Sequence, residues 1–315
     1  MKTVALALLL LAVGSPAAAE LRVFVTNEKS DDVTVIDAGS GRVLGSVKVG
    51  KRPRGVTVSP DGRRLYVSNS NSDTVSVIDA RALTVERSAP AGVDPEGLTL
   101  DPTGATLYVV NENELSLTIL DAATLATVKK VEVGKEPETA VVSPDGKWVA
   151  VSNESSHDVH FIDTASKTVA ARVAVSKNPR GMRFSKDSRQ LWVASEQGND
   201  VSVIDVATMK VMRSGPTGGS RPVDVVFSPD GTRAYVSHGQ SGDVRVLDTE
   251  TLRVLTVIPT GPRSWWMALS PDGRFLHVTV GRANEVAVID TQSNAVVRRV
   301  PAGTLPWGIA IADVP

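Results

Sequence analysis

The 315-residue sequence contains no cysteine, which excludes disulfides, thiolate metal sites, iron–sulfur clusters and c-type haem. Histidine is scarce, with four residues, and aromatic residues make up only 4% of the chain. Neither sign of charge dominates, because 34 Lys and Arg stand against 35 Asp and Glu. The formal net charge of −1 gives no general attraction to nucleic acid or to anionic lipid, so neither is an expected partner.

Residues 1–19 have the pattern of a secretory signal peptide. Lys2 precedes an apolar run at residues 4–13, which is too short to span a bilayer. Ala17 and Ala19 then supply the small residues of a cleavage site before Glu20. No later stretch approaches 18 consecutive apolar residues. We therefore expect an exported, soluble, periplasmic protein that does not enter the membrane.

An internal repeat accounts for residues 20–315. The tripeptide V-I-D, or a close variant, ends at Asp37, Asp79, Asp121, Asp163, Asp205, Asp248 and Asp290. The successive spacings are 42, 42, 42, 42, 43 and 42 residues. Each unit contains four short β-rich runs, and no helical periodicity is sustained. Because this period with four strands is typical of a propeller blade, the sequence predicts an all-β, seven-bladed β-propeller of four-stranded antiparallel blades.

The two ends of the chain contain complementary parts of one repeat. LRVFVTN (21–27) is a second-strand sequence, and PWGIAIA (306–312) is a first-strand sequence. We expect one closing blade shared between residues 20–50 and 304–315, which would join the ring and remove open sheet edges. The other blades are expected at 51–92, 93–134, 135–176, 177–219, 220–261 and 262–303.

Two repeated motifs are interpreted as structural. The S-P-D-G tetrapeptide, present for example at 59–62, predicts a tight turn in which Gly takes positive φ. The Asp of V-I-D recurs in every unit, so we expect it to end the third strand and to accept hydrogen bonds from the following turn.

The second-strand motifs FVTN (24–27), YVSN (66–69), YVVN (108–111) and AVSN (150–153) resemble the YVTN repeat. Together with S-P-D-G and V-S-V-I-D, they make residues 20–315 similar to the YVTN-repeat β-propeller family. Length, signal peptide and seven repeats also resemble the periplasmic propellers associated with alcohol catabolism dependent on pyrroloquinoline quinone (PQQ). The resemblance implies a periplasmic accessory protein and supplies no catalytic residue to carry over.

The positions at which the repeats differ are the candidate site. In an antiparallel meander, the loop before the innermost strand and the loop joining the second and third strands lie at the same edge. These loops should therefore form the mouth of the central channel. The candidate ligand- or partner-binding residues of this mouth are Arg54, Glu96, Glu138, Arg180, Arg221, His238, Arg263, Trp265 and Trp307.

The candidate residues also differ around the ring. Glutamates concentrate in the blades at 93–200, whereas arginines and three of the five tryptophans lie at 220–310. Trp and Arg are enriched at binding hot spots, and Arg suits carboxylate or phosphate groups. We expect a polarised mouth that binds a planar or anionic molecule or an acidic loop of a partner protein. The alternative is that the glutamates are only solvated and that the tryptophans plug the channel.

Catalysis and metal binding have weaker support. No G-x-S-x-G, H-E-x-x-H or phosphate-cradling glycine-rich loop occurs, and no cofactor is expected. His157 and His160 should face opposite sides of a strand, which disfavours chelation. The glutamates could hold a hard cation such as calcium, although no D-x-D-x-D-G loop is present. An enzymatic alternative is a lactonase-type hydrolase in which Glu138, Arg180 and His238 meet at the mouth.

Overall fold

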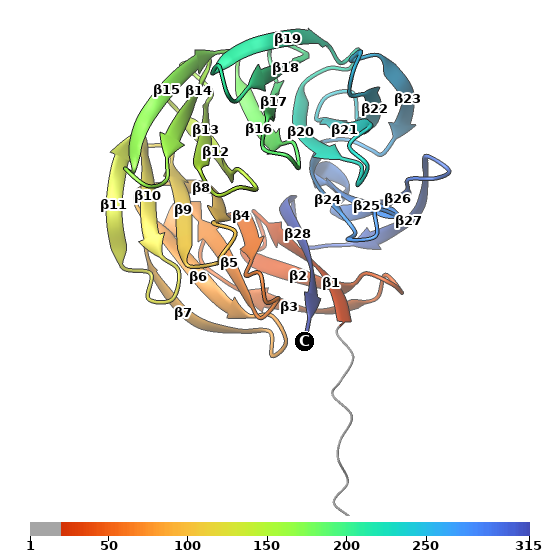
Figure 1. The fold of residues 1–315 in the computed structure, drawn as a ribbon. Helices are drawn as coiled ribbons and strands as arrows, with labels where there is room; N and C mark the ends of the chain where they lie inside the picture. The colour runs from red at the N-terminus through yellow and green to blue at the C-terminus, as the bar shows by residue number, and fades with distance from the viewer. Residues whose placement is uncertain (1–19) are drawn as a thin grey trace, which may run out of the picture.

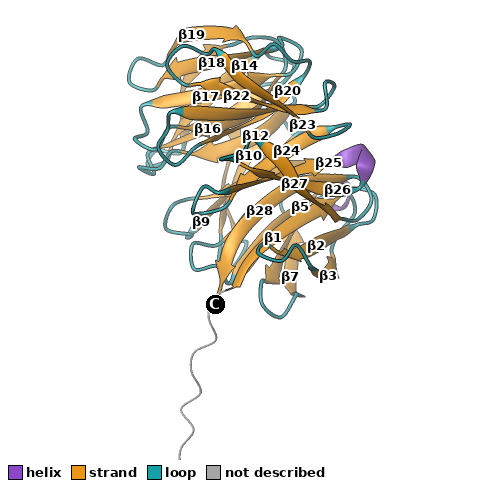
Figure 2. Ribbon diagram, turned by 90° about the vertical axis from the view of Figure 1, so that its right-hand side faces the viewer, coloured by secondary structure: helices purple, strands orange, loops and turns teal. Residues whose placement is uncertain are grey.

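The computed structural model describes residues 20–315, which form seven four-stranded sheets arranged in a ring (Figure 1). The predicted signal peptide, 1–19, lies outside the described residues. No helix within 20–315 has the length and apolar character that crossing a membrane requires. The side view in Figure 2 shows strands throughout, with a short helical turn at one edge.

The closing blade contains β28 (Pro306–Val314), β1 (Glu20–Asn27), β2 (Asp32–Asp37) and β3 (Val43–Lys48). Blade 1 contains β4 (Pro53–Val58), β5 (Arg64–Asn69), β6 (Thr74–Asp79) and β7 (Thr84–Pro90). Blade 2 contains β8 (Pro95–Leu100), β9 (Thr106–Asn111), β10 (Ser116–Asp121) and β11 (Thr127–Glu132). Blade 3 contains β12 (Pro137–Val142), β13 (Trp148–Asn153), β14 (Asp158–Asp163) and β15 (Thr168–Ala174).

Blade 4 contains β16 (Pro179–Phe184), β17 (Gln190–Ser195), β18 (Asp200–Asp205) and β19 (Lys210–Pro216). Blade 5 contains β20 (Pro222–Phe227), β21 (Arg233–His238), β22 (Asp243–Asp248) and β23 (Val254–Pro259). Blade 6 contains β24 (Ser264–Leu269), β25 (Phe275–Val280), β26 (Glu285–Asp290) and β27 (Ala295–Pro301). Two 3-10 turns, η1 (Ser70–Ser72) and η2 (Gly281–Ala283), follow β5 and β25.

Closure of the ring depends on pairing between the two ends of the chain. β28 pairs antiparallel with β1, from Glu20 opposite Val314 to Asn27 opposite Pro306. Figure 1 shows the blue C-terminal strand beside the red N-terminal one. The prediction of a seven-bladed propeller with one blade shared by both termini is therefore confirmed.

The repeated turns have the predicted structural roles. In the 59–62 turn, Ser59 Oγ donates to Asp61 at 2.6 Å, and Gly62 adopts φ 70°. In the V-I-D motif, Asp79 Oδ1 accepts hydrogen bonds from the backbone N–H groups of Arg81 and Ala82 at 2.9 and 2.6 Å. The equivalent aspartates make the same kind of contact with a Ser or Thr three residues later: Asp37, Asp121, Asp163, Asp205, Asp248 and Asp290.

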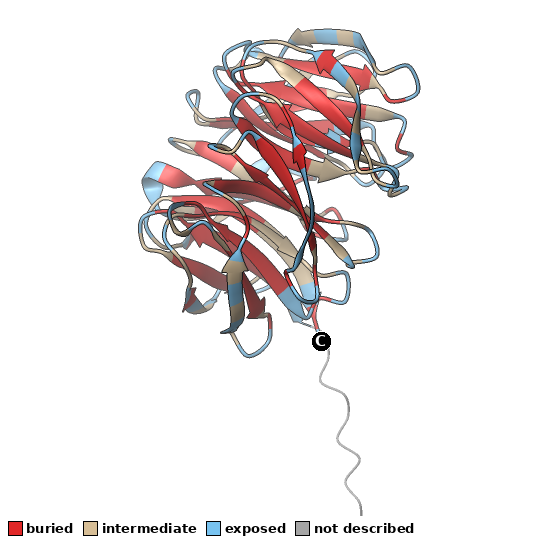
Figure 3. Ribbon diagram, turned by 90° about the vertical axis from the view of Figure 1, so that its left-hand side faces the viewer, coloured by how far each residue is buried: buried red, intermediate tan, exposed pale blue. Residues whose placement is uncertain are grey.

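The hydrophobic core lies between adjacent blades, since each cluster of buried apolar residues contains side chains from two neighbouring blades. Figure 3 shows the buried residues along the strands and the exposed ones mainly in the loops. The Ser or Thr of the YV[ST]N motif forms a hydrogen bond across this interface. Its hydroxyl donates to the backbone carbonyl of the second residue in the next innermost strand, as in Ser152 to Arg180 at 2.8 Å and Ser237 to Trp265 at 2.5 Å. Each of these hydrogen bonds holds the backbone carbonyl of the second residue of an innermost strand, and it therefore fixes the position of that residue.

Candidate functional site at the channel mouth

The two predicted loops do share one edge of every blade. One backbone hydrogen bond recurs around the ring. In each blade, the N–H of the residue that follows the second strand donates to the backbone carbonyl of the residue two positions before the second residue of the innermost strand. Examples are Glu112 to Asp94 at 3.0 Å and Glu196 to Asn178 at 2.8 Å. This edge, formed by the second residues of the innermost strands and by the loops after the second strands, is the channel mouth.

Arg54 is at the centre of one half of the mouth. This side chain from β4 contacts Glu28 at 2.9 Å and Glu96 at 3.1 Å. Its guanidinium also lies 4.9 Å from the centre of the Trp307 ring. Burial by itself opposes the charged form of Arg54, but the surrounding carboxylates, Glu96 first, outweigh it and raise its pKa. Arg54 is therefore a buried, fully compensated cation.

Arg180 is at the centre of the other half. It contacts Glu138 at 2.5 Å, Glu154 at 3.0 Å and Glu196 at 2.5 Å. Its guanidinium lies 5.2 Å from the Trp265 ring centre, so this residue of blade 4 reaches across to blade 6. Burial disfavours its charge, yet the three glutamates raise its pKa. Three carboxyl groups around one guanidinium leave no free face for an anion.

The tryptophans lie beneath these arginines. Trp265 and Trp307 are buried and form an apolar cluster with Val223, with Trp266 packed against it. Arg263 lies over the Trp265 ring at 4.7 Å and contacts Glu28 at 3.2 Å. The acidic and the basic–aromatic sectors therefore meet in one network instead of facing each other across an open gap. This burial agrees with the alternative that the tryptophans fill the channel.

Two further candidates have different positions. Arg221 is more than half exposed and pairs with Glu196 at 3.3 Å, at the outer margin of the network. His238 is fully buried, with Nε2 at 2.8 Å from Thr217 Oγ1 and Nδ1 at 3.1 Å from Asp243. It occupies the motif position at which four other blades have Asn. Glu138 and Arg180 pair with each other, but no hydrogen bond or ion pair among residues 20–315 joins His238 to either, so the three residues of the lactonase alternative do not meet.

The network has an excess of acid. Five arginines take part (Arg52, Arg54, Arg180, Arg221 and Arg263), and six carboxyl groups pair with them (Glu28, Asp94, Glu96, Glu138, Glu154 and Glu196). Burial, reinforced by neighbouring carboxylates, raises the pKa of Glu154 to about 9 and holds the pKa of Glu96 well above its usual range. Burial likewise raises the pKa of Asp94. Part of this acid is therefore protonated at neutral pH.

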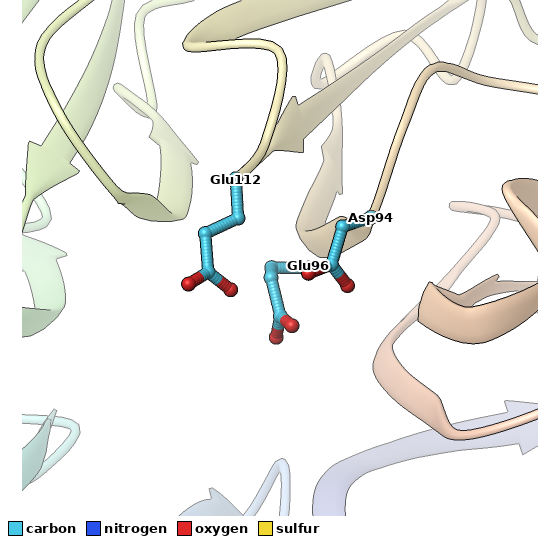
Figure 4. A group of neighbouring side chains, drawn as sticks. All are labelled: Asp94, Glu96 and Glu112. Carbon is cyan, nitrogen blue, oxygen red and sulfur yellow. The ribbon is translucent and has the colours of Figure 1, made fainter.

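Glu112 adds a carboxyl group that sequence reasoning placed near the mouth but did not select. It is half-buried, and burial followed by the charge of Glu138 raises its pKa. Ligand oxygens of Asp94, Glu96 and Glu112 lie within 4.8 Å of one another. Figure 4 shows these three side chains of blade 2 gathered at one place. Oxygen ligands in this number suit a hard cation, although Arg52 and Arg54 already compensate Glu96.

Comparison with known proteins identifies the fold family. The family of YNCE-like β-propellers matches residues 3–105 and 103–203. No curated protein matches the chain. Among solved structures, hydrazine synthase from Kuenenia stuttgartiensis has a TM-score of 0.77 and 23% identity over 87% of this chain and 99% of that one.

Two other solved structures are similar in shape. A functionally unknown protein from Desulfotomaculum acetoxidans has a TM-score of 0.83 and 16% identity, covering 93% of this chain and 99% of its own. A candidate 6-phosphogluconolactonase from Bacteroides fragilis has a TM-score of 0.80 and 18% identity, covering 95% and 99%. At these identities the likeness shows the fold alone, and the roles of these proteins are diverse.

Proposed function

We propose that this protein is a non-enzymatic binding module. The chain belongs to the YNCE-like β-propeller family, a fold that does not specify one function. Its channel mouth recognises a positively charged group on a small molecule or on a partner protein. The observation that carries this proposal is the surplus of carboxyl groups over arginines in the mouth network.

The sign of the ligand charge follows from the pairing. An anion would have to separate Arg180 from three glutamates, which would leave buried carboxylates uncompensated. A cation instead takes the place of protons on carboxyl groups such as Glu154 and Glu112, whose pKa values are raised by burial and by neighbouring carboxylates. Binding of a cation should therefore release protons.

Titration calorimetry with pentalysine tests this proposal, with pentaglutamate as the negative control. Glu112→Gln should weaken pentalysine binding about fivefold, since one charged contact is lost, while Glu132→Gln on the exposed outer strand β11 should not. Repeating the titration in buffers of different ionisation enthalpy measures the released protons. Equal affinity of both variants, or binding of pentaglutamate alone, contradicts the proposal. Binding of calcium but not pentalysine would assign the mouth to an inorganic cation instead.

The cellular setting is a separate part of the proposal. We place the protein in the periplasm as an accessory to PQQ-linked alcohol oxidation or to associated transport. The support is the signal-peptide pattern of residues 1–19 and the resemblance of the FVTN and YVSN motifs. Deleting the gene in its own bacterium and measuring growth on ethanol tests this setting, and unchanged growth would contradict it.

A lactonase-type hydrolase is the second candidate, favoured by the three carboxyl groups within 4.8 Å of one another. Because His238 is enclosed away from the mouth, such chemistry would depend on calcium held by Asp94, Glu96 and Glu112. A lactone panel assayed with and without calcium tests it. Calcium-dependent turnover that Glu112→Gln abolishes would support hydrolysis, and absence of turnover would exclude it.

A further inference from the structure

The central channel contains a cavity of about 1060 Å³ at the end away from the mouth. Its lining comes from the later residues of the innermost strands, such as Val58 and Leu269, and from the turns that follow them. Lys186 and Asp230 of those turns are exposed, so the cavity opens to solvent on the turn side of the ring. Its volume lies just above the ~300–1,000 Å³ usual for small-molecule sites.

Two tryptophans line this cavity and carry unused hydrogen-bond donors. Trp266 and Trp307 pack against each other with ring centres 5.0 Å apart. Both indole N–H groups are buried and have no hydrogen-bond partner among residues 20–315. Trp307 is only 2% exposed. The indole nitrogens are not accessible from the cavity, so the ring atoms of these two side chains are what lines it.

The position of Trp266 is itself a departure from the repeat. The third residue of the innermost strand is Gly in four blades, and a Cβ at Gly181 would lie 2.4 Å from the carbonyl oxygen of Val223 in the next blade. That spacing leaves no room for a side chain at this position in blade 4, whereas blades 3 and 5 have Thr139 and Asp224 here. In blade 6 an indole takes this position and extends to the channel wall. Structural repetition alone therefore does not account for Trp266.

A cation lies on the same wall. Arg183 of β16 lines the cavity, and its Nε donates to the carbonyl of Val225 at 3.2 Å. Its side chain forms no ion pair among residues 20–315, unlike Arg54 and Arg180 at the mouth. The nearby carboxylate of Asp224 is already occupied by the backbone N–H groups of Val225 and Met267, at 2.8 and 3.0 Å.

These contacts join the wall across consecutive blades. Arg183 in blade 4 bonds to blade 5, and Asp224 in blade 5 bonds to Met267, which follows Trp266 in blade 6. Trp266 then packs on Trp307 of the closing blade. The wall therefore brings the exposed guanidinium of Arg183 and two indole side chains to one lumen of mixed polar and apolar lining.

We propose that this lumen binds a planar aromatic carboxylate, with its carboxylate on Arg183 and its ring against Trp266. Carboxylates pair well with a guanidinium, and aromatic rings stack on indole. This site is distinct from the mouth in position and takes a ligand of the opposite charge.

Binding of 2-naphthoate, followed by tryptophan fluorescence and calorimetry, tests the proposal. Arg183→Gln should weaken binding about tenfold or more, because a charge-assisted contact is lost. Trp266→Leu removes the aromatic face, so about fivefold weakening is expected. Arg282→Gln is the matched control, since Arg282 is an exposed arginine beside the mouth that forms no ion pair within residues 20–315.

Thermal melting first establishes that each variant is folded. Absence of 2-naphthoate binding to the wild type, or equal affinity of Arg183→Gln and wild type, overturns the proposal. Equal binding of the neutral analogue 2-naphthylmethanol would also overturn it. The mouth variant Glu112→Gln should leave the affinity for 2-naphthoate unchanged. Failure of the cation-binding proposal for the mouth and failure of the lumen proposal can therefore be distinguished.

Discussion

Replacing Glu154 by Gln should change how stability depends on pH. Glu154 is buried beside Glu138 and Arg180, and burial raises its pKa from 4.5 to about 9. A carboxyl whose pKa rises on folding binds its proton more tightly in the folded state. Its contribution to stability is present in full below pH 4.5 and is lost as pH rises toward 9. The wild type should therefore become less stable as pH increases through neutrality.

The size of the effect follows from proton linkage. One proton bound in the folded state but not in the unfolded state changes the free energy of unfolding by about 1.4 kcal/mol per pH unit. Between pH 6 and pH 8, this group alone removes about 2.7 kcal/mol. The glutamine side chain of the variant would not titrate, and its amide oxygen can still accept the bond that Asn178 donates to Glu154 at 2.6 Å. The Glu154→Gln protein should therefore lose much less stability over this range.

Urea unfolding at several pH values measures both slopes. Glu132→Gln controls for the loss of an exposed carboxylate and should keep the wild-type slope. If Glu154→Gln and wild type lost stability in parallel between pH 6 and pH 8, Glu154 would be ionised in the folded protein. The mouth would then lack the protonated acid on which cation recognition depends.

Two other predictions concern the fold. Ser237→Ala, which removes the hydrogen bond to the Trp265 carbonyl, should cost about 1 kcal/mol of unfolding free energy in urea denaturation. Ser195→Ala is the control and should cost almost nothing, because Ser195, at the repeat position of His238, is a buried serine whose hydroxyl has no partner within residues 20–315. Equal losses would refute the role of the Ser237 hydrogen bond. Deleting residues 306–315 exposes β1 and removes the buried Trp307 and Val314. The melting temperature should therefore fall by about 10 °C or more, and an unchanged melting temperature would refute closure of the ring by β28.

Much of the fold is predictable because each repeat carries its own local chemistry. The Asp of V-I-D and the Gly of S-P-D-G determine turns through contacts within a few residues. Their spacing then determines the number of blades. Closure could be predicted as well, since LRVFVTN and PWGIAIA are successive parts of one repeat and can only pair with each other.

The site was less predictable because its contacts join distant repeats. The candidate positions do gather at one edge, as the meander requires. However, the guanidinium of Arg180 lies over the ring of Trp265, two blades away. No local sequence pattern shows which carboxylate each arginine will pair with. His238 was selected because it replaces Asn, yet it takes over the buried bonding position of that Asn. A departure from the repeat can therefore mark a structural substitution as well as a functional one.

The difference between these two kinds of departure is whether the new group is compensated. His238 has bonds to Thr217 and Asp243, so its neighbours account for it. Trp266 replaces a glycine, and its N–H has no partner within residues 20–315. Arg183 is an exposed arginine that donates to the Val225 carbonyl and forms no ion pair within residues 20–315, and no sequence pattern pointed to its position in the lumen. Because burial of an unpartnered polar group lowers stability, the contacts of the fold itself do not account for the indole of Trp266. By this reasoning the lumen, and not only the mouth, is where this propeller departs from the requirements of its own fold.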